Sequence, residues 1–138
     1  MLKIRSFVIQ ELLKQAESGY PEEICGLLVG LSEGNQRFAL GLYQTQNIAK
    51  DRLHDRYEID PKEYLKVEQR ARELGLEIIG VYHSHPDHPD SPSKYDLERA
   101  FEGFSYLIVS VRQGRVESYK SWELVGNNFE QESIQVVE

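Results

Sequence analysis

The chain has 138 residues, which is long enough for a single domain, spanning residues 1–138, to bury a core without disulfide bridges. Its net charge of −7, with no basic cluster, argues against a nucleic-acid partner, and the lack of any run of about 18 apolar residues argues against a membrane span. The single cysteine, Cys25, rules out an internal disulfide and is typical of a reducing compartment such as the cytoplasm.

The first half of the chain is expected to form a helix and then a β-hairpin. Apolar residues recur at helical spacing in the first segment, and Gly19 is a plausible stop. A short apolar run follows, and the turn signal SEGN joins it to a second strand-like segment. The expected elements are a helix over Phe7–Glu17, strands over Ile24–Leu31 and Gln36–Thr45, and a short strand over Arg56–Ile59.

The second half begins with a clear helix start. Asp60 can cap the helix, Pro61 suits its first position, and Glu63 completes an Asp-x-x-Glu box. The expected elements are this helix from Pro61 to Gly75, a strand over Leu76–Tyr82, a helix beginning at SKYDLERA, a hairpin of Ser105–Arg112 with Arg115–Glu123, and a last strand within Ser133–Val137. This order predicts an α/β (α+β) fold in which helices pack on a largely antiparallel mixed sheet.

The stretch HSHPDHPDSPSKYD, which follows a buried strand, concentrates polar side chains that can bind metal. His83 and His85 are two residues apart, so on a strand both point to one face, where two imidazoles can converge on one ion. Asp96 lies in the first turn of the next helix, from which its carboxylate can reach back to the end of the strand. Two histidines and one carboxylate, with one position left open, is the composition of a catalytic zinc site.

Simpler interpretations exist for each of these residues. A bare His-x-His pair is a weak signal, and Ser93 with Asp96 is most simply a helix cap. His88 and His54 are expected at the surface, while Cys25 is expected as a small buried side chain. Asp87 and Asp90 are expected to be turn formers or surface charges.

The full string resembles a known family. His-Ser-His-Pro, then six residues, then Ser-x-x-Asp is similar to the signature of the JAMM metalloproteases, also called MPN+ or Mov34/MPN/PAD-1 domains. That family also has a glutamate upstream in a Glu-x-Cys-Gly context, and Glu23 stands in this position within PEEICGLLVG. The resemblance covers roughly residues 1 to 125 and implies an MPN/JAB domain, a fold similar to that of the zinc deaminases.

The resemblance also implies roles for these residues. His83, His85 and Asp96 would hold one Zn²⁺, and Glu23 would act as the general acid and base. The Ser93 hydroxyl would donate to the oxyanion, although its capping role remains an alternative. Ser84 points to the opposite face of the strand and is expected to orient a neighbouring group through a hydrogen bond behind the metal ligands.

The family cuts amide and isopeptide bonds after the terminal glycine pair of ubiquitin or ubiquitin-like proteins. This chain lacks long insertions, so it is similar to the compact prokaryotic members, which act on sulfur carriers of the ThiS and MoaD kind. A phage-tail or cell-wall peptidase and a catalytically silent MPN scaffold are the alternatives. A deaminase is disfavoured because its Pro-Cys-x-x-Cys motif needs two cysteines. The oligomeric state is not indicated.

Overall fold

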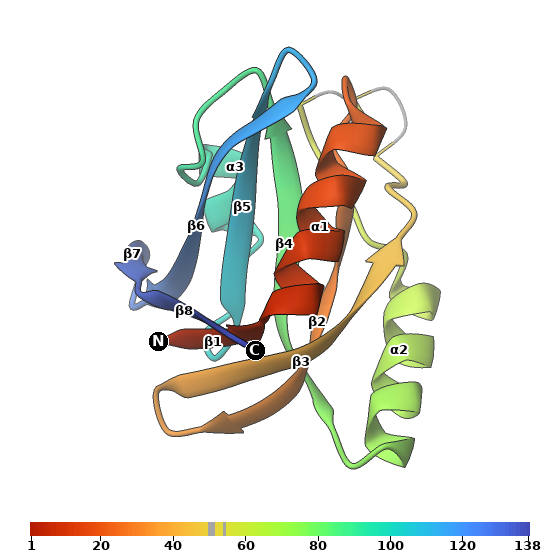
Figure 1. Cartoon of the computed structure of the whole chain (residues 1–138), viewed down its shortest axis with the longest axis vertical. Helices are drawn as coiled ribbons and strands as arrows, with labels where there is room; N and C mark the ends of the chain where they lie inside the picture. Colours follow the sequence, from red (N-terminus) through yellow and green to blue (C-terminus); the bar gives the residue numbers. More distant parts are fainter. Residues whose placement is uncertain (50–51, 54) are drawn as a thin grey trace.

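The structure is a computed structural model that describes residues 1–49, 52–53 and 55–138, so the expectation for His54 lies outside the described residues. Its elements, in chain order, are β1 (Leu2–Arg5), α1 (Ser6–Gly19), β2 (Cys25–Glu33), β3 (Gln36–Thr45), α2 (Pro61–Glu73), β4 (Glu77–Pro86), α3 (Lys94–Glu98), β5 (Ser105–Arg112), β6 (Arg115–Val125), β7 (Asn128–Glu132) and β8 (Ile134–Val137). Figure 1 shows their arrangement.

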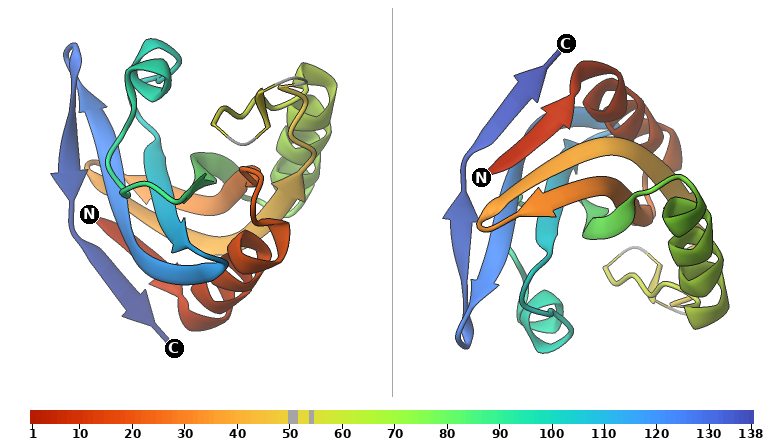
Figure 2. Two further views of the ribbon diagram at one scale, coloured as in Figure 1. Left: turned by 90° about the horizontal axis from the view of Figure 1, so that it is seen from above. Right: turned by 90° about the horizontal axis from the view of Figure 1, so that it is seen from below.

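The strands form one mixed sheet in the order β7-β6-β5-β4-β2-β3-β1-β8. The hairpins pair antiparallel, as does β2 with β4, whereas β4 pairs parallel with β5, and β1 pairs parallel with both β3 and β8. The two outer strands β7 and β8 are neighbours in the chain, and the carbonyl of the residue between them, Ser133, accepts a hydrogen bond from Leu2 N. The sheet is therefore curled, and one continuous segment of chain spans its two edges (Figure 2).

Helices cover the two faces of the sheet. The apolar face of α1 packs on one side with residues such as Leu28 and Tyr82, and α2 packs on the other side with Leu27 and Val81. The views in Figure 2 place α1 on one side of the sheet and α2 and α3 on the other. Because side chains alternate along a strand, Val81, His83 and His85 of β4 share the α2 side, and Ser84 faces the α1 side. The predicted fold class is confirmed.

Some predicted elements were wrong. Arg56–Ile59 is not a strand, and only Ile59 forms an isolated bridge, with Asn47. The Asn47 side chain instead satisfies the backbone there, because it donates to Arg56 O and accepts from Glu58 N. The Asp60 cap is confirmed by its bond from Lys62 N. Glu63 does not complete a capping box, since its carboxylate accepts from Gln46 N instead.

The sequence did not predict two strands, β1 and β7, and it predicted too short a β4. β1 alternates but has only four residues, which is too few for a clear strand signal, and β7 has one apolar residue among five. β4 was expected to end at Tyr82, but it continues to Pro86 because β2 and β5 pair with it on both sides. His83 and His85 therefore lie inside a paired strand. None of the helices formed by the described residues is long and apolar enough to cross a membrane.

Candidate metal centre and active site

Three side chains converge where β4 meets α3. The Nε2 atoms of His83 and His85 are 3.2 Å apart. Asp96 places one carboxylate oxygen 3.3 Å from His83 Nε2 and the other 3.2 Å from His85 Nε2. Ligands arranged tetrahedrally about 2.0–2.1 Å from zinc lie about 3.3 Å from one another. The spacing of these donor atoms therefore fits a zinc ion.

The surroundings orient these groups for metal binding. His85 Nδ1 lies 2.6 Å from the carbonyl oxygen of Pro89. A proton on Nδ1 satisfies that carbonyl and leaves the lone pair of Nε2 facing the site. The ring of Tyr57 stacks on His83, with centroids 4.2 Å apart, and the sequence had not singled out this tyrosine. His85 is thus oriented by a hydrogen bond and His83 by stacking, and the buried Nδ1 of His83 has no hydrogen-bond partner among the described residues.

Burial and neighbouring charges shift the pKa of His83 and of Asp96. It lowers the pKa of His83, and the nearby Asp96 carboxylate offsets only part of that effect, so the imidazole stays neutral. Burial alone would raise the pKa of Asp96. The histidines and the backbone N–H of Ser93 outweigh it and hold that pKa well below its ordinary range. A neutral imidazole and an ionised carboxylate are the forms in which such side chains ligate metal.

Glu23 lies beside this group, just before β2. Candidate ligand atoms of Glu23, His83 and His85 all lie within 4.8 Å of one another. The side chain is buried, with 4% exposed, and its Oε1 makes no hydrogen bond to any described residue. Burial raises the pKa of Glu23 to about 9, and the charges of Asp96 and Asp55 add to this effect. A buried carboxyl group with one oxygen that no described residue bonds is suited to exchanging protons with a molecule bound in the site.

Two side chains fix the backbone around Glu23. Ser84 Oγ, between the two histidines in β4, accepts a buried 2.9 Å hydrogen bond from Ile24 N. Asn47 Nδ2 donates to the carbonyl of Glu23 at 3.0 Å and also to Arg56 O. The hydrogen bond expected of Ser84 is present, and it ties the backbone next to Glu23 to β4, which carries His83 and His85. No pattern in a single sequence marks Asn47 for such a role.

Ser93 begins α3 on the exposed rim of the group. Its hydroxyl oxygen accepts from Asp96 N at 3.0 Å, and its own N–H donates to Asp96 Oδ2 at 2.9 Å. This reciprocal capping box confirms the predicted helix cap. The hydroxyl proton of Ser93 is not used in either bond.

The loop from Asp87 to Ser93 is anchored along its length. Tyr20 donates to the Asp87 carboxylate, Ser110 donates to His88 O, and Trp122 Nε1 donates to Asp90 O. Surface positions predicted for two of these residues were wrong. His88 is half-buried with its ring 4.3 Å from that of His85, and Asp90 is buried. Both are drawn inward because the loop folds back over the end of the sheet.

Cys25 is buried, as expected. It pairs across the strands with His83, and its thiol lies 3.4 Å from Thr45 Oγ1. Burial raises the pKa of Cys25 to about 12. A thiol that stays protonated at neutral pH is a poor nucleophile and a poor ligand.

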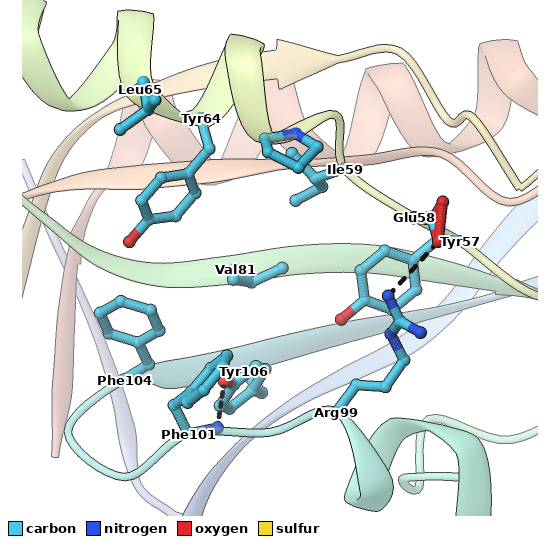
Figure 3. Close-up of a pocket in the computed structure, with 11 residues that line it drawn as sticks. Tyr57, Glu58, Ile59, Tyr64, Leu65, Val81, Arg99, Phe101, Phe104 and Tyr106 are labelled. Atoms are coloured by element: carbon cyan, nitrogen blue, oxygen red, sulfur yellow. Dashed lines mark hydrogen bonds and ion pairs between the residues drawn. The ribbon is translucent and has the colours of Figure 1, made fainter.

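An apolar pocket of about 700 Å³ opens next to the metal-binding group on the α2 side of the sheet. Figure 3 shows Tyr64 and Leu65 of α2 facing Phe101, Phe104 and Tyr106 across Val81 of β4. Leu65 and Phe101 are 61% and 69% exposed, so two large apolar side chains of this pocket face solvent. Tyr57, which stacks on His83, also lines the pocket, so the pocket lies directly beside the group formed by His83, His85 and Asp96.

Comparison with known proteins places the chain in a family. The family described as "Prokaryotic homologs of the JAB domain" matches residues 6–125. A desampylase of Haloferax volcanii is 32% identical, with 96% of this chain and 91% of that protein covered. A CysO-cysteine peptidase of Mycobacterium tuberculosis is 31% identical, with 100% and 92% covered.

Solved structures agree with this assignment. A protein of Desulfitobacterium hafniense is similar at a TM-score of 0.87 and 31% identity, with 100% of this chain and 94% of that one covered. A JAB1/MPN domain protein of Archaeoglobus fulgidus shares the fold at a TM-score of 0.58 and 21% identity, with 99% of both chains covered. The chain therefore belongs to the prokaryotic JAB-domain family, the compact branch of the JAMM/MPN+ proteins that its motifs predicted.

Proposed function

We propose that this protein is a zinc-dependent peptidase or isopeptidase that hydrolyses an amide bond after the terminal Gly-Gly of a ubiquitin-like sulfur carrier. The observation that carries the proposal is the convergence of His83, His85 and Asp96 beside the buried, unpartnered carboxyl of Glu23. The names of its relatives, desampylase and CysO-cysteine peptidase, support the substrate class.

The proposed metal site consists of His83, His85 and Asp96, whose donor spacing fits zinc. A zinc ion held there would supply Lewis-acid chemistry, lowering the pKa of a water molecule to about 7 and polarising the scissile carbonyl. The positive charge would also favour the ionised form of Glu23, against the burial that raises its pKa.

Glu23 is proposed as the general base and then the general acid. Its carboxylate takes a proton from the attacking water and passes it to the nitrogen of the leaving amine, so that the proton is neither gained nor lost overall. Ser84 and Asn47 hold the flanking backbone, which keeps this carboxylate aligned. Ser93 is proposed to donate its unused hydroxyl proton to the oxyanion that develops on the carbonyl.

The shape of the surface supports a protein substrate. The pocket between α2 and the start of β5 is apolar and has exposed Leu65 and Phe101 on either side. We assign it to the folded body of the carrier, whose extended tail would then pass over Tyr57 to the metal.

The proposal treats residues 1–138 as one catalytic domain in the cytoplasm. The family match over residues 6–125 supports the first part, as do the added sheet strands β1 and β8 at the two ends. The single buried cysteine is compatible with a cytoplasmic location.

Incubation with ThiS- and MoaD-type carriers extended beyond Gly-Gly, followed by mass spectrometry, tests the function. We expect cleavage after the second glycine by the wild type. Glu23→Gln should keep about one zinc per chain yet lose hydrolysis, whereas His83→Ala and Asp96→Ala should lose zinc. Equal zinc content in all variants would refute the ligand assignment, and full turnover by Glu23→Gln would remove its proposed role.

A further inference from the structure

The two histidines of the metal-binding group are oriented by different contacts. His85 Nδ1 lies 2.6 Å from the carbonyl oxygen of Pro89. The same nitrogen of His83 is buried and has no hydrogen-bond partner in the part of the chain that the structure describes. A metal-binding histidine almost always donates its second ring N–H to a carboxylate, a carbonyl or water, and that bond fixes the orientation of the ring. Within the described residues, the orientation of the His83 ring on the side away from the site therefore depends on packing.

Tyr57 supplies the packing contact of His83. The centroids of the two rings lie 4.2 Å apart, and their planes differ by only 21°. The ring of His85 is also near His83, but it lies 5.0 Å away and is tilted by 57°. A ring stacked face to face resists rotation of its neighbour, because rotation would drive an edge of the imidazole into the face of the tyrosine. The stack therefore restricts His83 as a hydrogen bond restricts His85.

The backbone on both sides of Tyr57 is anchored by one amide side chain. Asn47 Nδ2 donates to Arg56 O at 2.9 Å, and Asn47 Oδ1 accepts from Glu58 N at 3.0 Å. The same Nδ2 also donates to the carbonyl of Glu23. Tyr57 therefore extends from a fixed segment, and its ring has a defined place against His83.

Tyr57 also lies at the boundary between the apolar pocket and the buried histidine. Figure 3 shows its ring at the opposite end of the pocket from Phe104, with Val81 of β4 between them. Its contact with the metal-binding group is the stack on His83. An effect of Tyr57 on the metal would therefore be transmitted through this histidine.

We propose that Tyr57 is the positioning residue of His83, and that its ring takes the place of the missing hydrogen bond by holding the imidazole with Nε2 turned toward His85 and Asp96. The inference rests on the proposed function, because it presupposes these three residues as the metal ligands. It means that the two histidines depend on different supports. Loss of the Tyr57 ring should therefore weaken metal binding although every ligand is still present.

Two measurements on the full chain test this role: zinc affinity by competition with a chelator, and the visible absorption spectrum of the Co²⁺-substituted protein. Tyr57→Leu removes the ring and should weaken zinc binding by about 10- to 100-fold, the range for losing a group that orients a metal ligand. The Co²⁺ spectrum, which reports ligand geometry, should change with it. Tyr57→Phe keeps the ring and should keep the wild-type affinity and spectrum. Tyr43→Leu is the matched control, because Tyr43 of β3 packs against the same core cluster as Tyr57.

Wild-type affinity and spectrum in Tyr57→Leu would overturn the inference and leave the ligand assignment standing. An equal loss in Tyr57→Phe would also overturn it, because the effect would then belong to the hydroxyl. A wild type that binds no zinc would overturn the proposed function itself. NMR of the wild type decides the matter even if Tyr57→Leu folds poorly. Nuclear Overhauser contacts between the ring protons of Tyr57 and His83 should be present with and without zinc, and their absence from the zinc-loaded protein would refute the positioning role.

Discussion

At the scale of single residues, Glu23 combines a chemical advantage with a cost in stability. Its folded pKa of about 9 lies above the ordinary value of 4.5, so the folded state keeps a proton that the unfolded state has lost. Without metal, stability should therefore fall as the pH rises between these values, by up to about 1.4 kcal/mol per pH unit.

Urea unfolding in the presence of a chelator checks this dependence. Metal-free Glu23→Gln should be more stable than wild type at pH 8, and the difference should shrink toward pH 5, because glutamine cannot ionise. Glu22→Gln, at the exposed neighbouring position, should show no such trend. Parallel stability curves for wild type and Glu23→Gln across this range would contradict the assigned burial of the carboxyl.

Ser93 is a second residue in which two roles can be separated. Ser93→Ala removes the cap acceptor, which should lower the free energy of unfolding by about 1 kcal/mol. If its hydroxyl also donates to the oxyanion, turnover should fall by about 10²- to 10³-fold. Ser93→Thr keeps a hydroxyl and should retain most of both properties. A stability loss in Ser93→Ala without a change in turnover would leave only the capping role.

At the scale of elements, the hydrogen bond from Ile24 to Ser84 ties the segment of the proposed base, Glu23, to β4, which carries the proposed ligands His83 and His85. Ser84→Ala would leave the buried N–H of Ile24 without an acceptor, which costs about 1–3 kcal/mol. We expect turnover to fall more than zinc content does, because the lost bond lies next to Glu23 rather than on a ligand. Ser84→Thr retains the hydroxyl and serves as the control, and kinetics with metal analysis separates the two effects. Equal loss of zinc and turnover would indicate damage to the ligand strand itself.

The same elements explain what the sequence could predict. Side-chain alternation along the strand from Val81 to His85 predicted that both histidines lie on one face. Ser93 and Asp96 together predicted the start of a helix. Local pattern could not reveal Asn47, Tyr57 or Trp122, because their roles depend on contacts between distant segments. The same limit made Asp90 and His88 seem exposed. Glu23 was found only because its motif is a family signature.

At the scale of the whole molecule, the two edges of the curled sheet are joined through a buried polar network. Arg37 of β3 lies 3.3 Å from Glu132 of β7, and the other Glu132 oxygen accepts from Ser121 Oγ. Arg37 also donates to Gly103 O and to Ser105 Oγ at the start of β5. This network holds the sheet at the opposite end of the β4–β5 pair from His83 and His85.

Changes in this network should therefore alter the free energy of unfolding but leave zinc binding unchanged. Among the described residues, Glu132→Gln leaves the buried Arg37 with Glu123, at 3.7 Å, as its remaining anionic side-chain partner. It should lower the free energy of unfolding by about 3–5 kcal/mol. Replacing both residues, as Arg37→Met with Glu132→Leu, should recover part of this loss because neither charge then remains buried alone. Glu130→Gln, exposed on the same strand, is the control and should stay within about 0.5 kcal/mol of wild type. Zinc content of the folded variants should equal that of wild type, since the network contacts none of the three proposed ligands. Loss of zinc from folded Glu132→Gln would mean that closure of the sheet also shapes the metal-binding group.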